Sequence, residues 1–193
     1  MPDHLKNLLA EIRACKICEP HLVDGCRPVL QVSSAARIMV VGQAPGRRVH
    51  ESGIPFDDPS GERLRDWMGI DRNIFYDEKQ INIIPMGFCF PGTGKSGDLP
   101  PRKECAVAWR NRLLENLAEV DFTIVIGKYA MDWHLAGKGK KTLTDTVKSW
   151  QEYWPKIAVL PHPSPRNNIW LKRNPWFEGE LLPPLKARIK ALL

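Results

Sequence analysis

The sequence predicts an α/β fold built on a four-stranded parallel sheet, and three observations lead to this class. Four short apolar runs, rich in β-branched residues, are spaced along the 193-residue chain and are separated by helical patterns. The runs at residues 37–41 and 121–126 end directly at glycines, Gly42 and Gly127. Strands that alternate with helices and end in such turns are typical of a doubly wound sheet with helices on both faces.

The first half of the chain supplies two of the four strands. Apolar residues at helical spacing predict a helix over residues 4–14. The strand at 37–41 follows, and then a helix that Ser60 can cap and Gly69 can end. The apolar run at 81–84 predicts the second strand.

The second half begins with a loop rich in glycine, proline and lysine at residues 88–102. A loop of that length inside a compact domain is usually functional or anchored. Pro101 fits the first position of the helix predicted after it. The remaining elements are, in chain order, a helix at 104–117, a strand at 121–126, a helix at 128–135, a partly helical stretch at 142–154, a strand at 157–160 and a closing helix at 178–193.

Length and composition favour one domain over residues 1–193, with no membrane partner. No stretch approaches the roughly 20 apolar residues of a membrane span, and the N-terminus carries charges where a signal peptide has an apolar segment. We therefore expect a cytoplasmic protein, and we expect it to be a monomer. The net charge of +6 favours a polyanionic partner such as nucleic acid.

The loop at residues 42–46 is the first candidate site, because α/β proteins bind ligands at the carboxyl edge of the sheet. Its glycines let the backbone approach a ligand, and Gln43 offers both a donor and an acceptor. Downstream, Phe56 could stack on a flat ligand, and Glu51 or Asp58 could orient water. The alternatives are a tight turn, a core phenylalanine and solvated acids.

A second loop, at residues 162–167, follows the last predicted strand and is stiffened by prolines. His162 could donate to an oxyanion that develops on a leaving group. Ser164 and Arg166 can contact phosphates. The alternative is a structural histidine in a proline-rich turn. Both loops follow parallel strands, so the functional prediction depends on whether they face each other.

Taken together, these motifs resemble the uracil-DNA glycosylase superfamily. Gly-Gln-Ala-Pro-Gly at 42–46, Gly-Ile-Pro-Phe at 53–56, Ser-Gly-Glu-Arg-Leu at 60–64 and His-Pro-Ser-Pro at 162–165 occur in the family's order. The resemblance implies a three-layer α/β/α fold with a four-stranded parallel sheet. It also implies that DNA is the partner and that a flipped base is cut from its sugar between the two loops, with no cofactor needed for the chemistry.

The resemblance also implies individual roles. Phe56 would stack on the flipped base, and His162 would stabilise negative charge on the leaving uracil. The substrate-binding residues would be Gly42, Ala44, Pro45, Gly46, Phe56 and Asn82. The residues that press on the DNA would be Ser164, Arg166 and Asn167.

Two departures from the family pattern leave alternatives open. Ala44 and Gln43 occupy the positions nearest the water, and neither can act as a general base. The water would then be positioned by Gln43 with the backbone, or by Glu51 or Asp58. Asn82 lies early in its strand for a uracil-reading residue. A glycosylase for another damaged base and a DNA-binding relative without catalysis are therefore the alternative functions.

Four cysteines form a candidate metal site. Cys15 and Cys18 are a close pair, Cys89 and Cys105 follow a long interval, and Cys26 is left over. Sets of four thiolates hold zinc or a [4Fe–4S] cluster. This order resembles the iron–sulfur branch of the uracil-DNA glycosylases, which implies a structural [4Fe–4S] cluster. Zinc and unliganded thiols are the alternatives.

Overall fold

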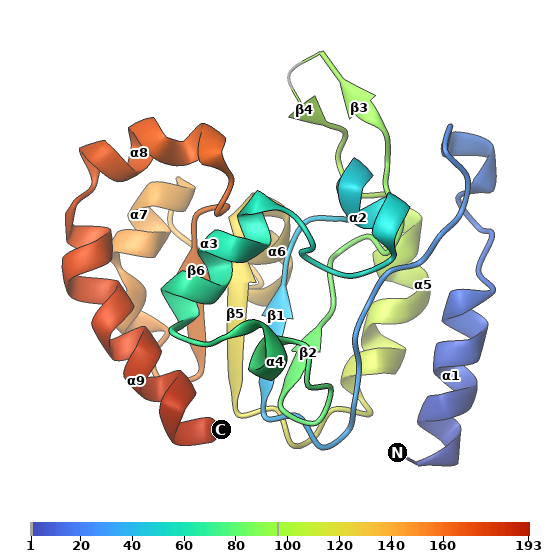
Figure 1. The fold of residues 1–193 in the computed structure, drawn as a ribbon, viewed down its shortest axis with the longest axis horizontal. Coiled ribbons are helices and arrows are strands. Elements are labelled where there is room, and N and C mark those ends of the chain that lie inside the picture. Colours follow the sequence, from blue (N-terminus) through green and yellow to red (C-terminus); the bar gives the residue numbers. More distant parts are fainter. Residues whose placement is uncertain (1, 96) are drawn as a thin grey trace.

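Four parallel strands form the centre of the protein in a computed structural model that describes residues 2–95 and 97–193 (Figure 1). They lie in the order β2-β1-β5-β6, and Ile38 of β1 pairs with Ile81 of β2 and Phe122 of β5. The predicted four-stranded parallel sheet is confirmed. In chain order, the strands are β1 (Ile38–Val41), β2 (Ile81–Ile83), β5 (Phe122–Ile126) and β6 (Ile157–Leu160).

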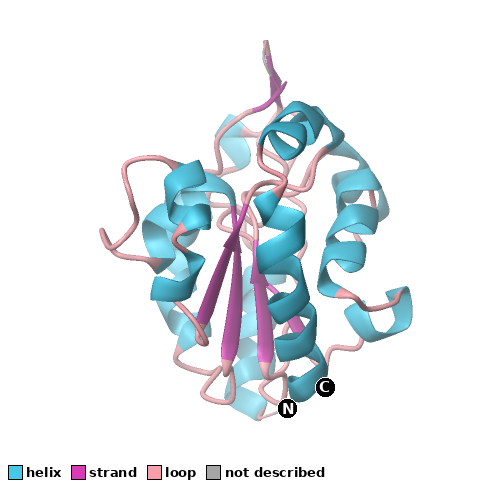
Figure 2. Cartoon of the chain, turned by 90° about the vertical axis from the view of Figure 1, so that its left-hand side faces the viewer, coloured by secondary structure: helices cyan, strands magenta, loops and turns pink. Residues whose placement is uncertain are grey.

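Helices cover both faces of the sheet, as Figure 2 shows, so the predicted three-layer α/β/α architecture is also confirmed. The connections from β1 to β2 and from β5 to β6 run in opposite directions across the sheet. Right-handed crossovers therefore place their helices on opposite faces. The α-helices are α1 (Asp3–Arg13), α2 (Arg47–Ser52), α3 (Pro59–Met68), α4 (Arg72–Phe75), α5 (Lys103–Leu114), α6 (Gly127–His134), α7 (Leu143–Lys148), α8 (Asn168–Arg173) and α9 (Leu182–Leu192).

Packing between these elements explains the continuous apolar runs in the sequence. α3 packs against α9, and α6 packs against β5 and β6, so the strands between these layers are buried on both faces. Asn82 is the polar exception in β2; its Oδ1 accepts the Ser33 N–H at 2.7 Å. No helix in the described part of the chain is both long and apolar enough to cross a membrane.

The start of α3 differs from the prediction that Ser60 caps it. Asp58 is the capping residue, and its Oδ1 accepts the Gly61 N–H at 2.8 Å. Pro59 occupies the first turn, where its missing N–H costs nothing. The predicted end is confirmed, because Gly69 adopts the left-handed conformation with φ of 69°.

The segment predicted as a loop at 88–102 contains a small hairpin of β3 (Thr93–Gly94) and β4 (Gly97–Asp98). It stands out from the body at the carboxyl edge of the sheet (Figure 1). The placement of Pro101 at the first helical position is wrong, because α5 begins at Lys103 with Arg102 as its N-cap. Helices α2, α4 and α8 are too short for their periodicity to be detected in the sequence.

Candidate active site

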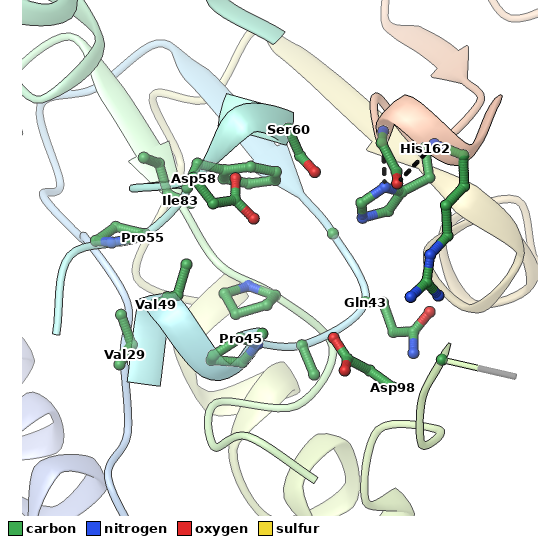
Figure 3. Close-up of a pocket in the computed structure, with 18 of the residues that line it drawn as sticks. Val29, Gln43, Pro45, Val49, Pro55, Asp58, Ser60, Ile83, Asp98 and His162 are labelled. Carbon is green, nitrogen blue, oxygen red and sulfur yellow. Dashed lines mark hydrogen bonds between the residues drawn. The ribbon is translucent and has the colours of Figure 1, made fainter. Parts of the chain in front are cut away.

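A pocket of about 470 Å³ lies at the carboxyl ends of the strands, between the loops at 42–46 and 162–167 (Figure 3). The two loops thus face each other, and the volume is in the range of sites that hold small ligands. The predicted site residues that line it are Gly42, Gln43, Ala44, Pro45, Gly46, Phe56, Asp58, His162, Ser164, Arg166 and Asn167.

The backbone of the first loop is fixed by the segment that follows β2. The carbonyl of Gly42 accepts the Met86 N–H at 2.9 Å, and that of Gln43 accepts the Gly87 N–H at 3.0 Å. The Gln43 side chain donates through Nε2 to the Leu99 carbonyl at 3.1 Å. This bond uses one of the two amide N–H groups and fixes the side chain, and Oε1 can accept a hydrogen bond from a ligand.

Phe56 is held in a strained conformation at the wall of the pocket. Its φ is 55°, which is costly for a side chain with a Cβ, by about 1–3 kcal/mol. A Cβ on Gly61 would lie 1.7 Å from the Phe56 carbonyl oxygen, and one on Gly42 would lie 3.3 Å from the Phe56 ring. These two glycines allow the ring to lie against the first loop. The Phe56 ring also makes an edge-to-face contact with Phe75, at 6.1 Å between ring centroids, and this contact helps to hold it in place.

His162 is presented as a neutral hydrogen-bond donor. Its Nδ1 accepts the Ser164 N–H at 3.2 Å, so the neutral ring carries its proton on Nε2. Burial lowers the pKa of His162 below its ordinary value, and the carboxylates of Asp58 and Asp98 oppose part of this shift. The Asn167 side chain donates to the His162 carbonyl at 2.7 Å and fixes the backbone of the loop.

Arg63 of α3 braces the second loop from outside the pocket, a role that the sequence did not reveal. Its guanidinium donates to the Ser164 carbonyl at 3.1 Å and to Asn168 Oδ1 at 2.8 Å. Because α3 begins three residues after Phe56, Arg63 links the segment that carries Phe56 to the loop that carries His162. The sequence shows that Arg63 follows Phe56 by seven positions. It does not show which residues the Arg63 side chain contacts across the fold.

The acidic candidates are placed differently. Asp58 lines the pocket while its Oδ1 caps α3, so its other carboxylate oxygen remains for a ligand or water. Glu51 does not line the pocket; it lies exposed on α2, and its carbonyl accepts a bond from Arg27 at 2.8 Å. Asp98 of β4, which the motifs did not indicate, does line the pocket (Figure 3).

Asn82 does not line the pocket either. Successive side chains of a strand point to opposite faces, and it is Ile83 that lines the pocket, together with Pro85. The Asn82 amide turns instead toward Ser33, and its Nδ2 is buried without a hydrogen-bond partner among the described residues. The wall at the end of β2 is therefore apolar.

The hairpin forms a third wall. Gly97 and Asp98 line the pocket. The Gln43 side chain fixes the end of β4, because it donates to the carbonyl of Leu99, the next residue. A Cβ on Gly97 would lie 2.5 Å from Nη1 of Arg166, so this glycine lets the guanidinium pack against the hairpin. The only sequence signal for this wall was the length and glycine content of the loop.

Comparison with known proteins identifies the family. Residues 31–186 match the family model described as the Uracil DNA glycosylase superfamily. The chain belongs to this superfamily. It is also similar to the crystal structure of wild-type Pedobacter heparinus SMUG2, with 17% sequence identity, coverage of 79% of this chain and 75% of that chain, and a TM-score of 0.38.

A second cavity brings five cysteines together, three of which precede the superfamily match. Arg102 and Trp109 complete its polar and aromatic wall. No three metal-binding side chains of the described residues converge on one point as the ligands of a single ion do. The sulfurs surround a space instead. The cysteines that line it are Cys15, Cys18, Cys26, Cys89 and Cys105.

Several of these sulfurs already accept N–H donors. The Trp109 indole donates to Cys15 Sγ at 3.3 Å, and the Phe88 amide donates to Cys105 Sγ at 3.3 Å. A backbone hydrogen bond from Arg27 reaches Cys89. Burial raises the pKa of Cys89 and of Cys105 to about 12. The backbone N–H donors oppose part of this rise because they stabilise negative sulfur, as they would on metal-bound thiolates.

The pocket and the cysteine cavity share two backbone segments. Pro28 lines the cavity and Val29 lines the pocket, and likewise Gly87 lines the cavity and Pro85 the pocket. The fully buried Arg110 fixes the second segment by donating to the Pro85 carbonyl at 3.0 Å and to the preceding carbonyl at 3.1 Å. The two cavities are therefore separated by a shared backbone wall.

Proposed function

We propose that the protein is a DNA-repair glycosylase that flips uracil, or a related damaged base, into the pocket and hydrolyses its N-glycosidic bond. The observation that carries the proposal is His162, a buried neutral imidazole whose Nδ1 is occupied and whose Nε2–H faces the Gly42–Gly46 loop across the pocket. Membership of the superfamily supports the same reaction class.

The chemistry assigns one role to the histidine. As the bond between C1′ and the base nitrogen breaks, the electron pair leaves with the base and negative charge grows on its carbonyl oxygen. A donor from Nε2 of His162 stabilises that charge without giving up its proton. Loss of one such preorganised donor lowers kcat by about 10²–10³-fold in other enzymes.

The attacking water is assigned to Asp58. Water adds its oxygen to the cationic C1′, and its proton passes to the Asp58 carboxylate and then to solvent. Asp58 lines the pocket, whereas Glu51 does not, and the amide of Gln43 can orient water but cannot accept its proton. Asp58 is therefore favoured over the other two candidates that the sequence left open.

DNA would be bound at the rim of the pocket. Ser164, Arg166 and Asn167 come from one proline-stiffened loop, and the ordering of that loop by Arg63 lowers the entropy cost of contacting phosphates. Phe56 would stack on the flipped base, an interaction worth about 1–3 kcal/mol. The positive net charge supports binding to the DNA backbone.

One observation favours a second candidate function, a glycosylase for another deaminated base. Ile83 and Pro85 form the wall where a uracil-reading amide is expected, and Asn82 faces away from it. A base would then be read by backbone groups, by Gln43 Oε1 and by Asn167. Hypoxanthine and xanthine belong in the substrate panel for this reason.

The test is excision from duplexes that each carry one lesion, measured as strand cleavage after alkali. We expect cleavage at uracil, and we expect His162→Ala to lower the single-turnover rate about 10²–10³-fold. His4→Ala, on the exposed side of α1, is the matched control. Cleavage only at another base would select the second candidate. DNA binding without cleavage of any lesion would support a non-catalytic relative.

We further propose a structural [4Fe–4S] cluster held by Cys15, Cys18, Cys89 and Cys105. The N–H donors aimed at three of these sulfurs support it. When bound, the cluster would cross-link the end of α1, the segment after β2 and the start of α5, and it would take no part in excision. Brown, iron-containing protein from an anaerobic preparation is the expected result; a colourless, iron-free preparation contradicts it.

A further inference from the structure

The cysteine cavity contains one thiol more than a cluster needs. A [4Fe–4S] cluster takes four cysteine ligands, and five cysteines line this cavity. Cys18 and Cys105 are buried, Cys15, Cys26 and Cys89 are partly exposed, and the side chains of Cys26 and Cys89 interact with each other. The extra thiol is therefore next to a proposed ligand.

The backbone fixes Cys26 beside Cys89. The Val29 N–H donates to the Phe88 carbonyl at 2.7 Å, and the Arg27 N–H bonds to Cys89. Because of these two bonds, the segment that carries Cys26 lies alongside the segment that carries Cys89. The side chains of Cys26 and Cys89 are close enough to interact as a result. Main-chain pairing thus brings the segment that carries Cys26 next to Cys89.

We propose that Cys26 and Cys89 are interchangeable ligands for one iron of the cluster, with Cys15, Cys18 and Cys105 as the fixed ligands. The inference rests on the proposed cluster. Because Cys26 and Cys89 are neighbours in the cavity, either would hold the cluster at this corner when it is bound, and the other would remain as a free thiol. Exchange moves one iron–sulfur bond between two thiolates, and the incoming thiol transfers its proton to the departing one, so no oxidant or reductant is needed.

The segment that carries Cys26 also contacts the helix beside the active-site pocket. Arg27 follows Cys26 directly, and its guanidinium donates to the Glu51 carbonyl at 2.8 Å near the end of α2. A Cβ on Gly53 would lie 2.7 Å from that guanidinium, so the contact is close. The chain from Gly53 leads into Phe56. The segment that carries Cys26 is therefore tied by one hydrogen bond to the end of α2, three positions before Ile54 and the chain that leads to Phe56.

The test measures iron and acid-labile sulfide per chain in the anaerobically purified full chain. Cys26→Ser and Cys89→Ser should each keep the wild-type content. The double variant, and Cys15→Ser as the positive control for loss, should fall to background. Loss of iron in Cys89→Ser alone, loss in Cys26→Ser alone, or retention in the double variant would each overturn the exchange. An iron-free wild type would instead show that the cluster itself is wrong.

A measurement on the wild type covers the case in which a serine variant fails to fold. The loaded protein is treated with iodoacetamide, and the labelled peptides are mapped. One label per chain, divided between Cys26 and Cys89, is the expected result. A label confined to Cys26, or confined to Cys89, would show a fixed ligand set and overturn the proposal.

Discussion

The two cavities of this protein are neighbours that are built in opposite ways. The pocket is wide, and its chemistry comes from loop side chains that follow β1 and β6. The cysteine cavity is narrow, and its thiols come from three segments that are distant in sequence. Replacement of a pocket side chain should therefore change a rate and leave the fold intact. Replacement around the cysteines should change stability and leave the chemical step intact.

Asp58→Asn gives the largest expected effect on the pocket side of this comparison. Asparagine is also a good N-cap, so α3 should remain capped, whereas the amide cannot accept a proton from water. We expect the single-turnover excision rate to fall about 10²–10⁴-fold, with little change in the urea midpoint of unfolding.

The control is Asp57→Asn, the adjacent acid, which pairs with Arg72 at 2.9 Å and does not line the pocket. Its rate should stay within about threefold of wild type, since an exposed ion pair contributes 1 kcal/mol or less. Equal losses in the two variants would remove Asp58 from the reaction and leave Gln43 as the water-positioning residue.

Gly61→Ala tests whether the pocket wall at Phe56 also contributes to the stability of the fold. The new Cβ would lie 1.7 Å from the Phe56 carbonyl oxygen, so the backbone must shift. We expect a loss of about 1–3 kcal/mol in the free energy of unfolding, together with weaker capture of the base by Phe56. Urea denaturation and single-turnover kinetics measure the two parts.

Gly179→Ala is its control, because no atom lies within 4 Å of the Cβ it would add. This control should be neutral or slightly stabilising. A stable Gly61→Ala with normal excision would mean that Phe56 does not need its left-handed conformation.

The pocket was predictable because its residues lie in short motifs directly after strands. Gly42 to Gly46 and His162 were found in this way. Asn82 was also predicted to bind substrate, but the period-two alternation of the strand turns Ile83 toward the pocket and Asn82 away from it. Asp98 was not predicted because its two-residue strand carries no motif, and Arg63 was not predicted because its partners lie more than 100 residues away in sequence. Nothing in the sequence near Arg63 indicates the Ser164 carbonyl that it binds.

The sheet was predictable for the same reason, since buried parallel strands are continuous apolar runs. The hairpin was not, because strands of two residues carry no periodicity. The convergence of Cys26 with the other cysteines was hidden as well: it depends on pairing between the segment at 26–31 and the segment after β2. The single domain over residues 1–193 stays a prediction.

Trp109→Phe is the corresponding change on the cysteine side, with a smaller effect. It removes the indole N–H that donates to Cys15 and keeps an aromatic ring. We expect a loss of about 1–2 kcal/mol, from one hydrogen bond and some buried area, and an unchanged excision rate. Trp133→Phe, at a tryptophan that is 37% exposed, is the control. A slower chemical step in Trp109→Phe would show that the two cavities are not separable.

The smallest effect is a pH dependence of stability that arises from the pocket. Burial lowers the pKa of His162 in the folded protein, so the unfolded chain takes up the proton first as pH falls. The stability is therefore complete above the unfolded value of about 6.5 and decreases below it, by at most about 1.4 kcal/mol per pH unit for each histidine. His134, buried beside Arg110 with its pKa lowered to about 3, adds a contribution of the same sign.

His162→Asn should reduce the slope of unfolding free energy against pH below 6.5 by up to one proton, measured by urea denaturation at a series of pH values. His4→Asn controls for the loss of one titrating group at an exposed position. Protonation of His162 at Nδ1 would also break its bond from the Ser164 N–H. The pH at which excision declines should therefore lie below 6.5, in the same window as the stability change. If His162→Asn leaves the slope as it is in the wild type, the fold does not hold the His162 ring neutral.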